Sequence, residues 1–223
     1  MMIKKSNPDQ ISNEDEIEKS LELRFNFTFD SRDAAVKAAR CLNCFDAPCS
    51  RSCPTKINVA LFIKQIAEGN AAGAARTIFS ENPLGGICAR VCPAEVLCEG
   101  ACVFIAQNQP AIEIARLQQY AMDNVKENRL IPRSQGKLPA AKVAIIGAGA
   151  AGLSCAHYLN ESGIAVSIYE SKSEIGGLLN GAIADYKITR EIALEELKSL
   201  LDPMIELRFN EKVDLDKLQG IID

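Results

Sequence analysis

The 223-residue chain has little of what several functional classes depend on. It contains one histidine and no tryptophan, and aromatic residues make up only 5% of the sequence. A surface that stacks nucleic-acid bases needs such aromatic residues, and the net charge of −4 opposes binding to a phosphate backbone. The sequence also lacks the run of about 18 apolar residues that a membrane span requires. We therefore expect neither a nucleic acid nor a membrane as a partner.

Cysteine is the residue type that the chain has in excess, with nine copies. The first ten residues lack the apolar core of a signal peptide, so we expect a cytoplasmic protein. Thiols are kept reduced in the cytosol, which makes a disulfide framework improbable for these cysteines. Metal or cluster ligation is the better starting hypothesis.

Eight of the cysteines fall into two runs whose spacing suggests iron–sulfur ligation. The first run is C-x2-C-x4-C-x3-C-P and the second is C-x3-C-P-x4-C-x3-C; their members are Cys41, Cys44, Cys49 and Cys53, then Cys88, Cys92, Cys98 and Cys102. A tight run that ends in Cys-Pro is typical of ferredoxins, where the last cysteine ligates a neighbouring cluster. This pattern predicts two adjacent [4Fe–4S] clusters, whereas structural zinc would favour two separated cysteine pairs.

Helical patterns surround the cysteine runs. Asp30 or Ser31 can cap a helix that leads into the first run, and residues 55–70, 71–82 and 110–128 show helical periodicity. The segment 81–86 is a predicted turn by composition. The predicted buried positions are Val59, Phe62, Ile63, Ile66, Ile112, Ala115, Leu117 and Tyr120. We expect cysteine-bearing loops between these helices.

The pattern changes at Lys142, where a strand, a glycine turn, a helix and a second strand ending in Glu170 follow one another. The turn is G-x-G-x-x-G, and in this context it is the dinucleotide-binding fingerprint. Gly176 and Gly177 allow a second backbone approach to the dinucleotide, which favours FAD over NAD. Cys155 is expected to be a small buried hydrophobe, and His157 is given no catalytic role.

These patterns predict a multidomain α + α/β protein. We place an N-terminal arm at 1–30, a helical double-cluster domain at 31–130 and a linker at 131–141. A Rossmann-like FAD-binding domain follows at 142–223. Two strands and part of a third do not complete a doubly wound sheet, so we expect a truncated FAD domain. No nicotinamide-binding motif is evident, so NAD(P)H would bind a domain outside this chain.

Four stretches are specific enough to compare with known families. They are CLNCFDAPCSRSCP, NPLGGICARVCPAEVLCEGAC, IARLQQY, and the glycine turn with the IYE and IGGL that follow it. Together they resemble the N-terminal iron–sulfur and FAD portion of dihydropyrimidine dehydrogenase, or the flavin subunit of its bacterial two-subunit form. The resemblance runs from about residue 25 to the end. The glutamate synthase small subunit is similar to a lesser degree, and DAPC favours the dihydropyrimidine dehydrogenase branch.

The resemblance implies a particular ligand set for each cluster. One cluster would be held by four thiolates, from Cys41, Cys44, Cys49 and Cys102. The other would be held by three thiolates and an amide oxygen, from Cys53, Cys92, Cys98 and Gln118. Cys88 would then carry no iron. A neutral amide in place of a thiolate makes that cluster one unit less negative, and charge is one determinant of cluster potential.

The resemblance also implies where FAD would bind. The contacts that it implies are Val91, Gly147, Ala148, Gly149, Ala150, Ala151, Glu170, Gly177, Leu178 and Val213, with the ribose hydroxyls at Glu170. The glycine pattern itself adds Gly152 and Gly176. Lys187 stands where the family has an arginine that touches the flavin. Lysine keeps the charge but lacks the planar fork of arginine, so this contact departs from the family pattern.

We therefore expect the electron-transfer part of an NAD(P)H-dependent oxidoreductase, with FAD, two clusters and no catalytic side chain of its own. The expected partner is an FMN-containing catalytic domain or subunit, in a homo- or hetero-oligomer. One alternative is the glutamate synthase small subunit, which would donate electrons to a different partner. The other is a zinc-stabilised dinucleotide-binding protein that acts as a sensor or interaction module.

Overall fold

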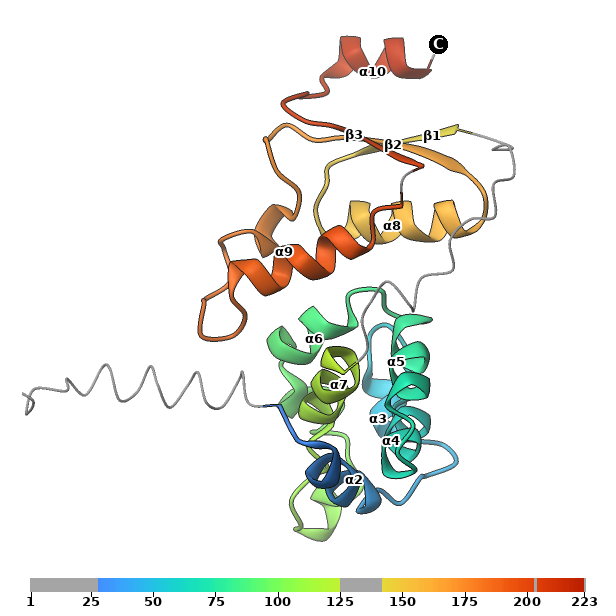
Figure 1. Cartoon of the computed structure of the whole chain (residues 1–223), viewed down its shortest axis with the longest axis vertical. Coiled ribbons are helices and arrows are strands. Elements are labelled where there is room, and N and C mark those ends of the chain that lie inside the picture. The colour runs from blue at the N-terminus through green and yellow to red at the C-terminus, as the bar shows by residue number, and fades with distance from the viewer. Residues whose placement is uncertain (1–27, 125–141, 203, 223) are drawn as a thin grey trace, which may run out of the picture.

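The computed structural model describes residues 28–124, 142–202 and 204–222, which form a helical domain and a sheet-containing domain (Figure 1). Of the predicted N-terminal arm, only residues 28–30 are described, and the predicted linker at 131–141 lies outside the described residues. Among the described residues, no helix combines the length and the apolar composition that crossing a bilayer requires.

The helical domain contains six α-helices in its described part. They are α2 (Ser31–Ala39), α3 (Pro48–Ser52), α4 (Val59–Ala67), α5 (Ala71–Phe79), α6 (Gly85–Val91) and α7 (Ile114–Asp123), with short 3₁₀ turns at Ala94–Val96 and Ile105–Gln107. Side chains cap three of the helices: Asp30 accepts from Asp33 N, Asn58 from Leu61 N and Asn70 from Gly73 N. These short polar side chains satisfy backbone donors that have no partner within the helix.

The core of the helical domain follows the predicted periodicity closely. The four predicted positions of α4 are all buried, and so are Ile112, Leu117 and Tyr120 around α7. Ala115 is only half-buried, whereas Ile114, the first residue of α7, is fully buried. The helix begins four residues later than the start of the predicted segment, and this places Ile114 on the inner face.

Two expectations about the cysteine segments were wrong in detail. Gly85 and Gly86 belong to the first turn of α6 and are not part of the predicted turn at 81–86. The cysteines do not all lie in loops, because Cys49 is on α3 and Cys88 is on α6. Glycine has a low helix propensity, so composition alone favours a turn at this point.

The second domain is a three-stranded parallel sheet with helices. Its elements are β1 (Lys142–Ile146), α8 (Ala150–Glu161), β2 (Ala165–Tyr169), α9 (Arg190–Ser199), β3 (Ile205–Arg208) and α10 (Leu215–Ile222). The strand order is β1-β2-β3, with Val143 beside Val166 and Val166 beside Ile205. Helices α8 and α9 lie on one side of the sheet and α10 lies on the other (Figure 1). This is a Rossmann-like arrangement.

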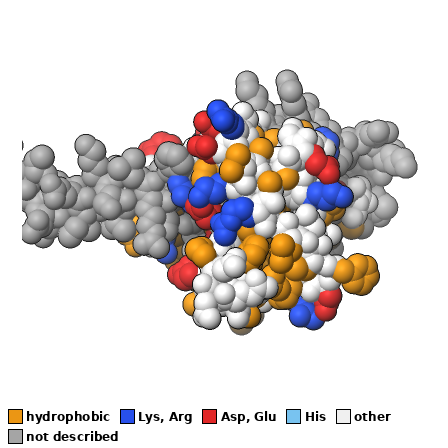
Figure 2. All heavy atoms as spheres, turned by 90° about the horizontal axis from the view of Figure 1, so that it is seen from below, with side chains coloured by type: hydrophobic (Ala, Val, Ile, Leu, Met, Phe, Trp, Pro, Cys, Tyr) orange, Lys and Arg blue, Asp and Glu red, His pale blue; other side chains and the backbone are white. Residues whose placement is uncertain are grey.

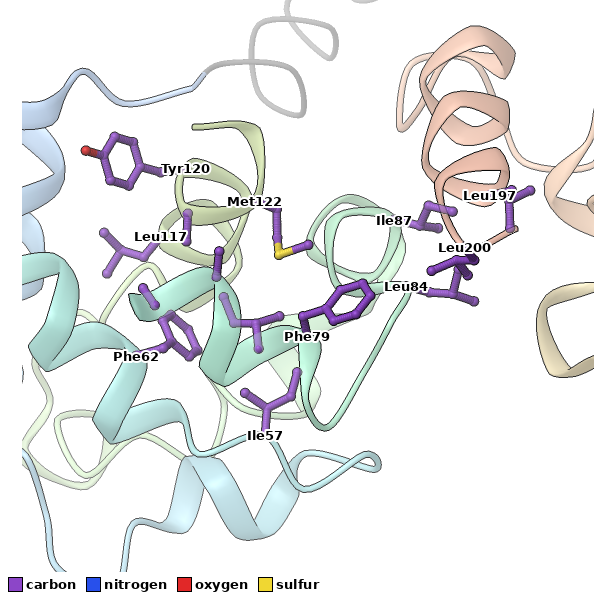
Figure 3. Packing of buried hydrophobic residues seen from close by; sticks show 14 of the residues in the cluster. Ile57, Phe62, Phe79, Leu84, Ile87, Leu117, Tyr120, Met122, Leu197 and Leu200 are labelled. Carbon is purple, nitrogen blue, oxygen red and sulfur yellow. The ribbon is translucent and has the colours of Figure 1, made fainter. Parts of the chain in front are cut away.

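The two domains meet through α6 and α9 and through α5 and α8. Leu84, just before α6, and Ile87 on α6 lie opposite two residues of the second domain (Figure 3). These are Leu197 on α9 and Leu200, which directly follows α9. At the second contact, the ring of His157 on α8 meets the ring of Phe79 edge-on, with centroids 5.1 Å apart. The histidine is therefore buried at the domain boundary, where it packs.

Candidate functional site

The first cysteine set surrounds one cavity of the helical domain. Cys41 and Cys44 come from the segment that joins α2 to α3, Cys49 lies on α3, and Cys102 approaches from the segment before α7. The cavity has about 370 Å³ of empty space, its open mouth included. Its remaining lining is mostly apolar, with Ile63 among the buried contributors. Four thiols thus share one enclosure.

The protonation behaviour of these thiols reports how close together they lie. Burial raises the pKa of Cys49 to about 11, and the charges of Cys41 and Cys102 add to the rise. Burial likewise raises the pKa of Cys41, with a further contribution from Cys44 and Cys102. Thiolates held this close repel one another, so they ionise together only beside a cation. Metal ligation requires the thiolate form and supplies such a cation.

The second cysteine set surrounds a larger cavity with about 580 Å³ of empty space, its open mouth included. Its predicted iron ligands lie around one enclosure, namely Cys53, Cys92, Cys98 and Gln118. Burial raises the pKa of Cys98 to about 12, helped by the charges of Glu99 and Cys53. The structure thus brings together the same two groups of residues that the resemblance implies; that they bind iron stays a prediction.

Cys88 lines the second cavity as well. It lies one helical turn before Cys92, and a hydrogen bond between the two thiols raises the pKa of Cys88 and lowers that of Cys92. Spacing alone could have placed Cys88 here, since cysteines at i and i+4 share a helix face. The side chain is thus adjacent to the predicted ligands.

Gln118 is oriented by a hydrogen bond to the backbone. The side chain is only 8% exposed, and its Nε2 donates to the carbonyl oxygen of Gly85 at 2.7 Å. Because a carbonyl oxygen only accepts, the nitrogen end of the amide must face it. The amide oxygen is therefore the end that could bind a metal cluster in the cavity.

The thiols of both sets line their cavities without being drawn onto a single point. In residues 28–124, 142–202 and 204–222, no group of three or more His, Cys, Asp or Glu side chains is gathered tightly enough to hold one metal ion. Cys155, expected to be buried, is exposed on α8. The apolar residues of this helix do not form a single clear stripe, so the pattern did not fix which way Cys155 faces.

The glycine turn of the second domain leaves room for a ligand at the N-terminus of α8. Gly147 has a φ of +98°, which side chains rarely tolerate. A Cβ on Gly152 would stand 2.0 Å from the Gly147 carbonyl oxygen, and a Cβ on Gly177 would stand 3.1 Å from the Cα of Gly149. Gly149 also bridges to Gly176, so the two glycine segments lie together. This cradle fits the close backbone approach that a pyrophosphate needs.

Glu170 ties the glycine turn to the end of β2. Its carboxylate accepts from Ala148 N at 2.8 Å, from Lys172 N at 2.9 Å and from Ser171 Oγ at 3.1 Å. Burial by itself would raise the pKa of Glu170, but these donors outweigh it and hold the pKa below its usual value. The carboxylate is therefore an ionised acceptor placed beside the cradle, as a ribose-binding acid would have to be.

The other predicted dinucleotide contacts differ in how exposed they are. Ala148 is buried and Ala150 is half-buried, whereas Ala151 is exposed at the start of α8. Leu178, which follows the second glycine pair, is largely exposed. The remaining candidates are half-buried, namely Val91 in α6, Lys187 before α9 and Val213 after β3. Their contact with FAD remains a prediction.

Comparison with known proteins identifies both domains. Residues 19–130 match the family described as dihydropyrimidine dehydrogenase domain II, 4Fe–4S cluster, and residues 145–187 match an NAD(P)-binding Rossmann-like domain. The NAD-dependent dihydropyrimidine dehydrogenase subunit PreT of Escherichia coli K12 is 37% identical over 185 residues. That match covers 83% of this chain and 45% of the relative. A PreT homolog from Salmonella typhi is 38% identical, over 79% of this chain and 43% of the relative.

A more distant match is the NADPH glutamate synthase small chain of E. coli K12, which is 34% identical over 84% of this chain and 40% of the relative. The chain thus spans less than half the length of these curated relatives. The match to the first family extends over half of the chain and contains all eight cysteines of the two runs. On that match, the chain belongs to the dihydropyrimidine dehydrogenase domain II, 4Fe–4S cluster family.

Proposed function

We propose that this chain is the electron-transfer part of an NAD(P)H-dependent flavin and iron–sulfur oxidoreductase that serves pyrimidine reduction. The proposal extends to two [4Fe–4S] clusters and to FAD as the dinucleotide. When bound, FAD accepts a hydride and releases electrons singly, and the clusters carry single electrons. The protein's own part is to hold these groups, to space them and to set their potentials.

The observation that carries the proposal is the separation of the thiols into two cavities. Each cavity presents three or more thiols, and the second adds the oriented amide of Gln118. Cys49 and Cys53 lie on either side of the boundary between the sets, one at each end of the short helix α3. This helix forces the two enclosures to be neighbours, and short separations favour rapid electron transfer.

The second domain supports FAD on the same reasoning. The Gly147–Gly152 turn offers backbone and the positive end of α8 to a pyrophosphate, and Glu170 offers an acceptor for ribose hydroxyls. Helix α6 links the proposed cluster site and the proposed FAD site. It carries Cys88, ends at Val91, which is a predicted FAD contact, and is followed by Cys92, which is a predicted cluster ligand. We assign no acid, base or nucleophile to the chain.

Electrons would leave through the first cavity to an FMN-containing catalytic subunit. The loop between Cys41 and Cys49 carries two exposed apolar side chains, Leu42 and Phe45. Leu42 also lines the first cavity, so this surface lies directly over the proposed cluster. Figure 2 views the molecule from below, and apolar side chains lie there among basic and acidic ones. The PreT relatives are named as subunits, which supports a partner subunit of some kind.

Metal and sulfide analysis tests the proposal most directly. Anaerobically purified protein should contain about eight iron atoms and about eight acid-labile sulfides per chain, as two [4Fe–4S] clusters require. About four of each would reduce the proposal to one cluster. Zinc without iron would reject it in favour of the zinc-stabilised alternative.

The assignment of the eighth ligand is tested by two substitutions in the same cavity. We expect Gln118→Ala to perturb the second cluster, seen as iron loss or an altered electron paramagnetic resonance (EPR) spectrum. We expect Cys88→Ala to leave both clusters assembled. The reverse result would show that the second cluster uses the cysteine and not the glutamine.

The glutamate synthase relative defines the competing function. A small chain of that enzyme would donate electrons to a glutamate-forming subunit and would share the same cofactors. Affinity purification from the native host separates the two functions. Recovery of a subunit with pyrimidine-dependent reductase activity supports our proposal, and recovery of a glutamine-hydrolysing subunit supports the competitor.

A further inference from the structure

One peptide group at the start of α6 connects the two domains through hydrogen bonds at both of its ends. The carbonyl oxygen of Gly85 accepts from Gln118 Nε2 at 2.7 Å. The N–H of Gly86, which belongs to the same peptide group, donates to Glu196 Oε1 at 2.8 Å. Glu196 lies on α9, in the dinucleotide-binding domain. A carboxyl group of one domain is thus two hydrogen bonds away from a predicted cluster ligand of the other.

The whole connection is shielded from water. Glu196 is 4% exposed, and both glycines and Gln118 are also buried. Hydrogen bonds are stronger electrostatically where water is excluded, and bonds arranged in a chain polarise one another. A carboxylate that accepts from Gly86 N–H therefore makes the Gly85 carbonyl a stronger acceptor. That carbonyl in turn polarises the Gln118 amide, whose Nε2 donates to it.

Steric constraints show that this approach is tight. A Cβ on Gly86 would stand 2.5 Å from Glu196 Oε2, and a Cβ on Gly85 would stand 2.4 Å from Ile78 Cγ2. The double glycine is what lets α9 and α5 come this close to the peptide group. Apolar packing then fixes the position of α9, because Leu197 and Leu200 lie against the α6 region (Figure 3).

The direction of the hydrogen bonds decides which end of the Gln118 amide faces the cavity. The two ends of an amide have nearly the same shape, so packing alone distinguishes them poorly. The Gly85 carbonyl selects the nitrogen, and Glu196 holds that carbonyl's peptide group in place. The oxygen is then left for the cavity that Gln118 shares with three cysteines.

We propose that Glu196 is a positioning residue for the second cluster, acting through the Gly85–Gly86 peptide group to orient and polarise the amide of Gln118. The inference rests on the proposed function in one respect, which is that the Gln118 oxygen is a cluster ligand. It adds that the dinucleotide-binding domain sets the properties of this ligand. Docking of α9 and the potential of the second cluster are then coupled.

A purely structural role for Glu196 gives a different expectation. If the carboxyl group only caps the first turn of α6, any side chain that accepts from Gly86 N–H would serve equally well. Glutamine can accept through its amide oxygen but carries no charge. Glu196→Gln therefore separates capping from polarisation, and Glu195→Gln is the matched control because Glu195 is exposed on the same helix.

The experiment measures iron content and EPR-monitored midpoint potentials in the cluster-loaded protein. We expect Glu196→Gln to keep the iron of the unaltered protein and to raise the potential of the second cluster, because its ligand becomes less electron-rich. The potential of the first cluster should not move. Glu195→Gln, which removes the same charge in solvent, should change neither potential.

Glu196→Ala provides a second readout, since it removes the acceptor altogether. We expect it to lose about half of the iron while the EPR signal of the first cluster persists, in line with two four-iron clusters. If this variant fails to fold, the potentials of the glutamine variant still decide the question.

Two results separate failure of the inference from failure of the proposed function. If Gln118→Ala alters the second cluster but Glu196→Gln shifts neither potential, or shifts them as Glu195→Gln does, the relay is wrong and the ligand assignment stands. If Gln118→Ala leaves iron and spectra unchanged, the ligand assignment itself is wrong, and the inference falls with it.

Discussion

Leu197→Ala should weaken the chain at the contact between its domains. The side chain of Leu197 is 0% exposed and lies where α9 packs on the α6 region of the helical domain (Figure 3). Truncation removes its buried methyl groups and leaves a cavity that well-packed neighbours fill only in part. Such substitutions cost about 2.7–5 kcal/mol. At about 1.4 kcal/mol per factor of ten, the folded-to-unfolded ratio should fall roughly 100- to 4,000-fold.

Urea unfolding followed by far-ultraviolet circular dichroism measures this loss, with linear extrapolation to water. In a thermal scan the same change should lower Tm by about 5–20 °C, since about 1 kcal/mol moves a chain of this size by about 2–4 °C. Leu215→Ala is the matched control, because Leu215 is 84% exposed on α10. A loss below about 1 kcal/mol for Leu197→Ala, or an equal loss in both variants, would refute the packing argument.

Three further predictions concern single polar or glycine positions. Asp123→Asn removes the carboxylate that lies 2.7 Å from the buried guanidinium of Arg90. We expect the free energy of unfolding, measured in urea, to fall by about 2–3 kcal/mol. This is less than for a fully buried pair, because Asp123 is 31% exposed. Gly152→Ala should abolish retention of FAD, measured by flavin absorbance after gel filtration, because its Cβ collides with the Gly147 carbonyl. Glu170→Gln should cost its full amount of stability above the unfolded pKa of about 4.5, and progressively less as the pH falls below it.

The sign of the last prediction follows from the direction of the shift. Burial would raise the pKa of Glu170, but its hydrogen-bond donors lower it below 4.5 on balance. The ionised carboxylate therefore stabilises the folded state above that pH, and this contribution disappears as the pH falls through the lower folded-state pKa. Unfolding curves of the two proteins should converge on acidification. A stability difference that stays constant down to pH 3 would contradict this account.

The other two predictions have controls on the same chain. Asp46 pairs with Arg51 on the surface, where ion pairs contribute little, so Asp46→Asn should stay within about 0.5 kcal/mol of the unaltered protein. Gly220→Ala should leave FAD binding intact, because no atom lies within 4 Å of its added Cβ. Equal effects of the paired variants would mean that burial and crowding do not govern these positions.

Much of the architecture could be predicted because it depends on local patterns. Helix α4 shows its buried face directly in the spacing of Val59, Phe62, Ile63 and Ile66, and the fingerprint from Lys142 to Glu170 predicted the first β–α–β unit. Cysteine spacing predicted two neighbouring groups of thiols, and the structure places thiols around two cavities; that they bind iron stays a prediction. These features are repeated within a few residues, so no knowledge of tertiary neighbours is needed.

The remaining features depend on residues far apart in the sequence. Gly85 and Gly86 suggested a turn by composition, yet they begin a helix, and glycine stands there because Ile78 and Glu196 leave no room for a Cβ. The orientation of Gln118 depends on Gly85, which lies 33 positions away. Periodicity describes one face of one element, and it carries no information on which partner that face meets.

The contact between Gly86 and Glu196 also bears on the order in which the protein matures. These residues are 110 positions apart, so their hydrogen bond closes one of the longest loops in the fold. The loss of chain entropy on closing a loop grows with its length, and contacts of this kind are expected late in folding. A nascent chain would thus complete its first thiol cavity, with thiols between Cys41 and Cys102, before α9 exists to dock. We expect the four-thiolate site to acquire iron first, and the site containing Gln118 to become fully competent only once the second domain has folded onto α6.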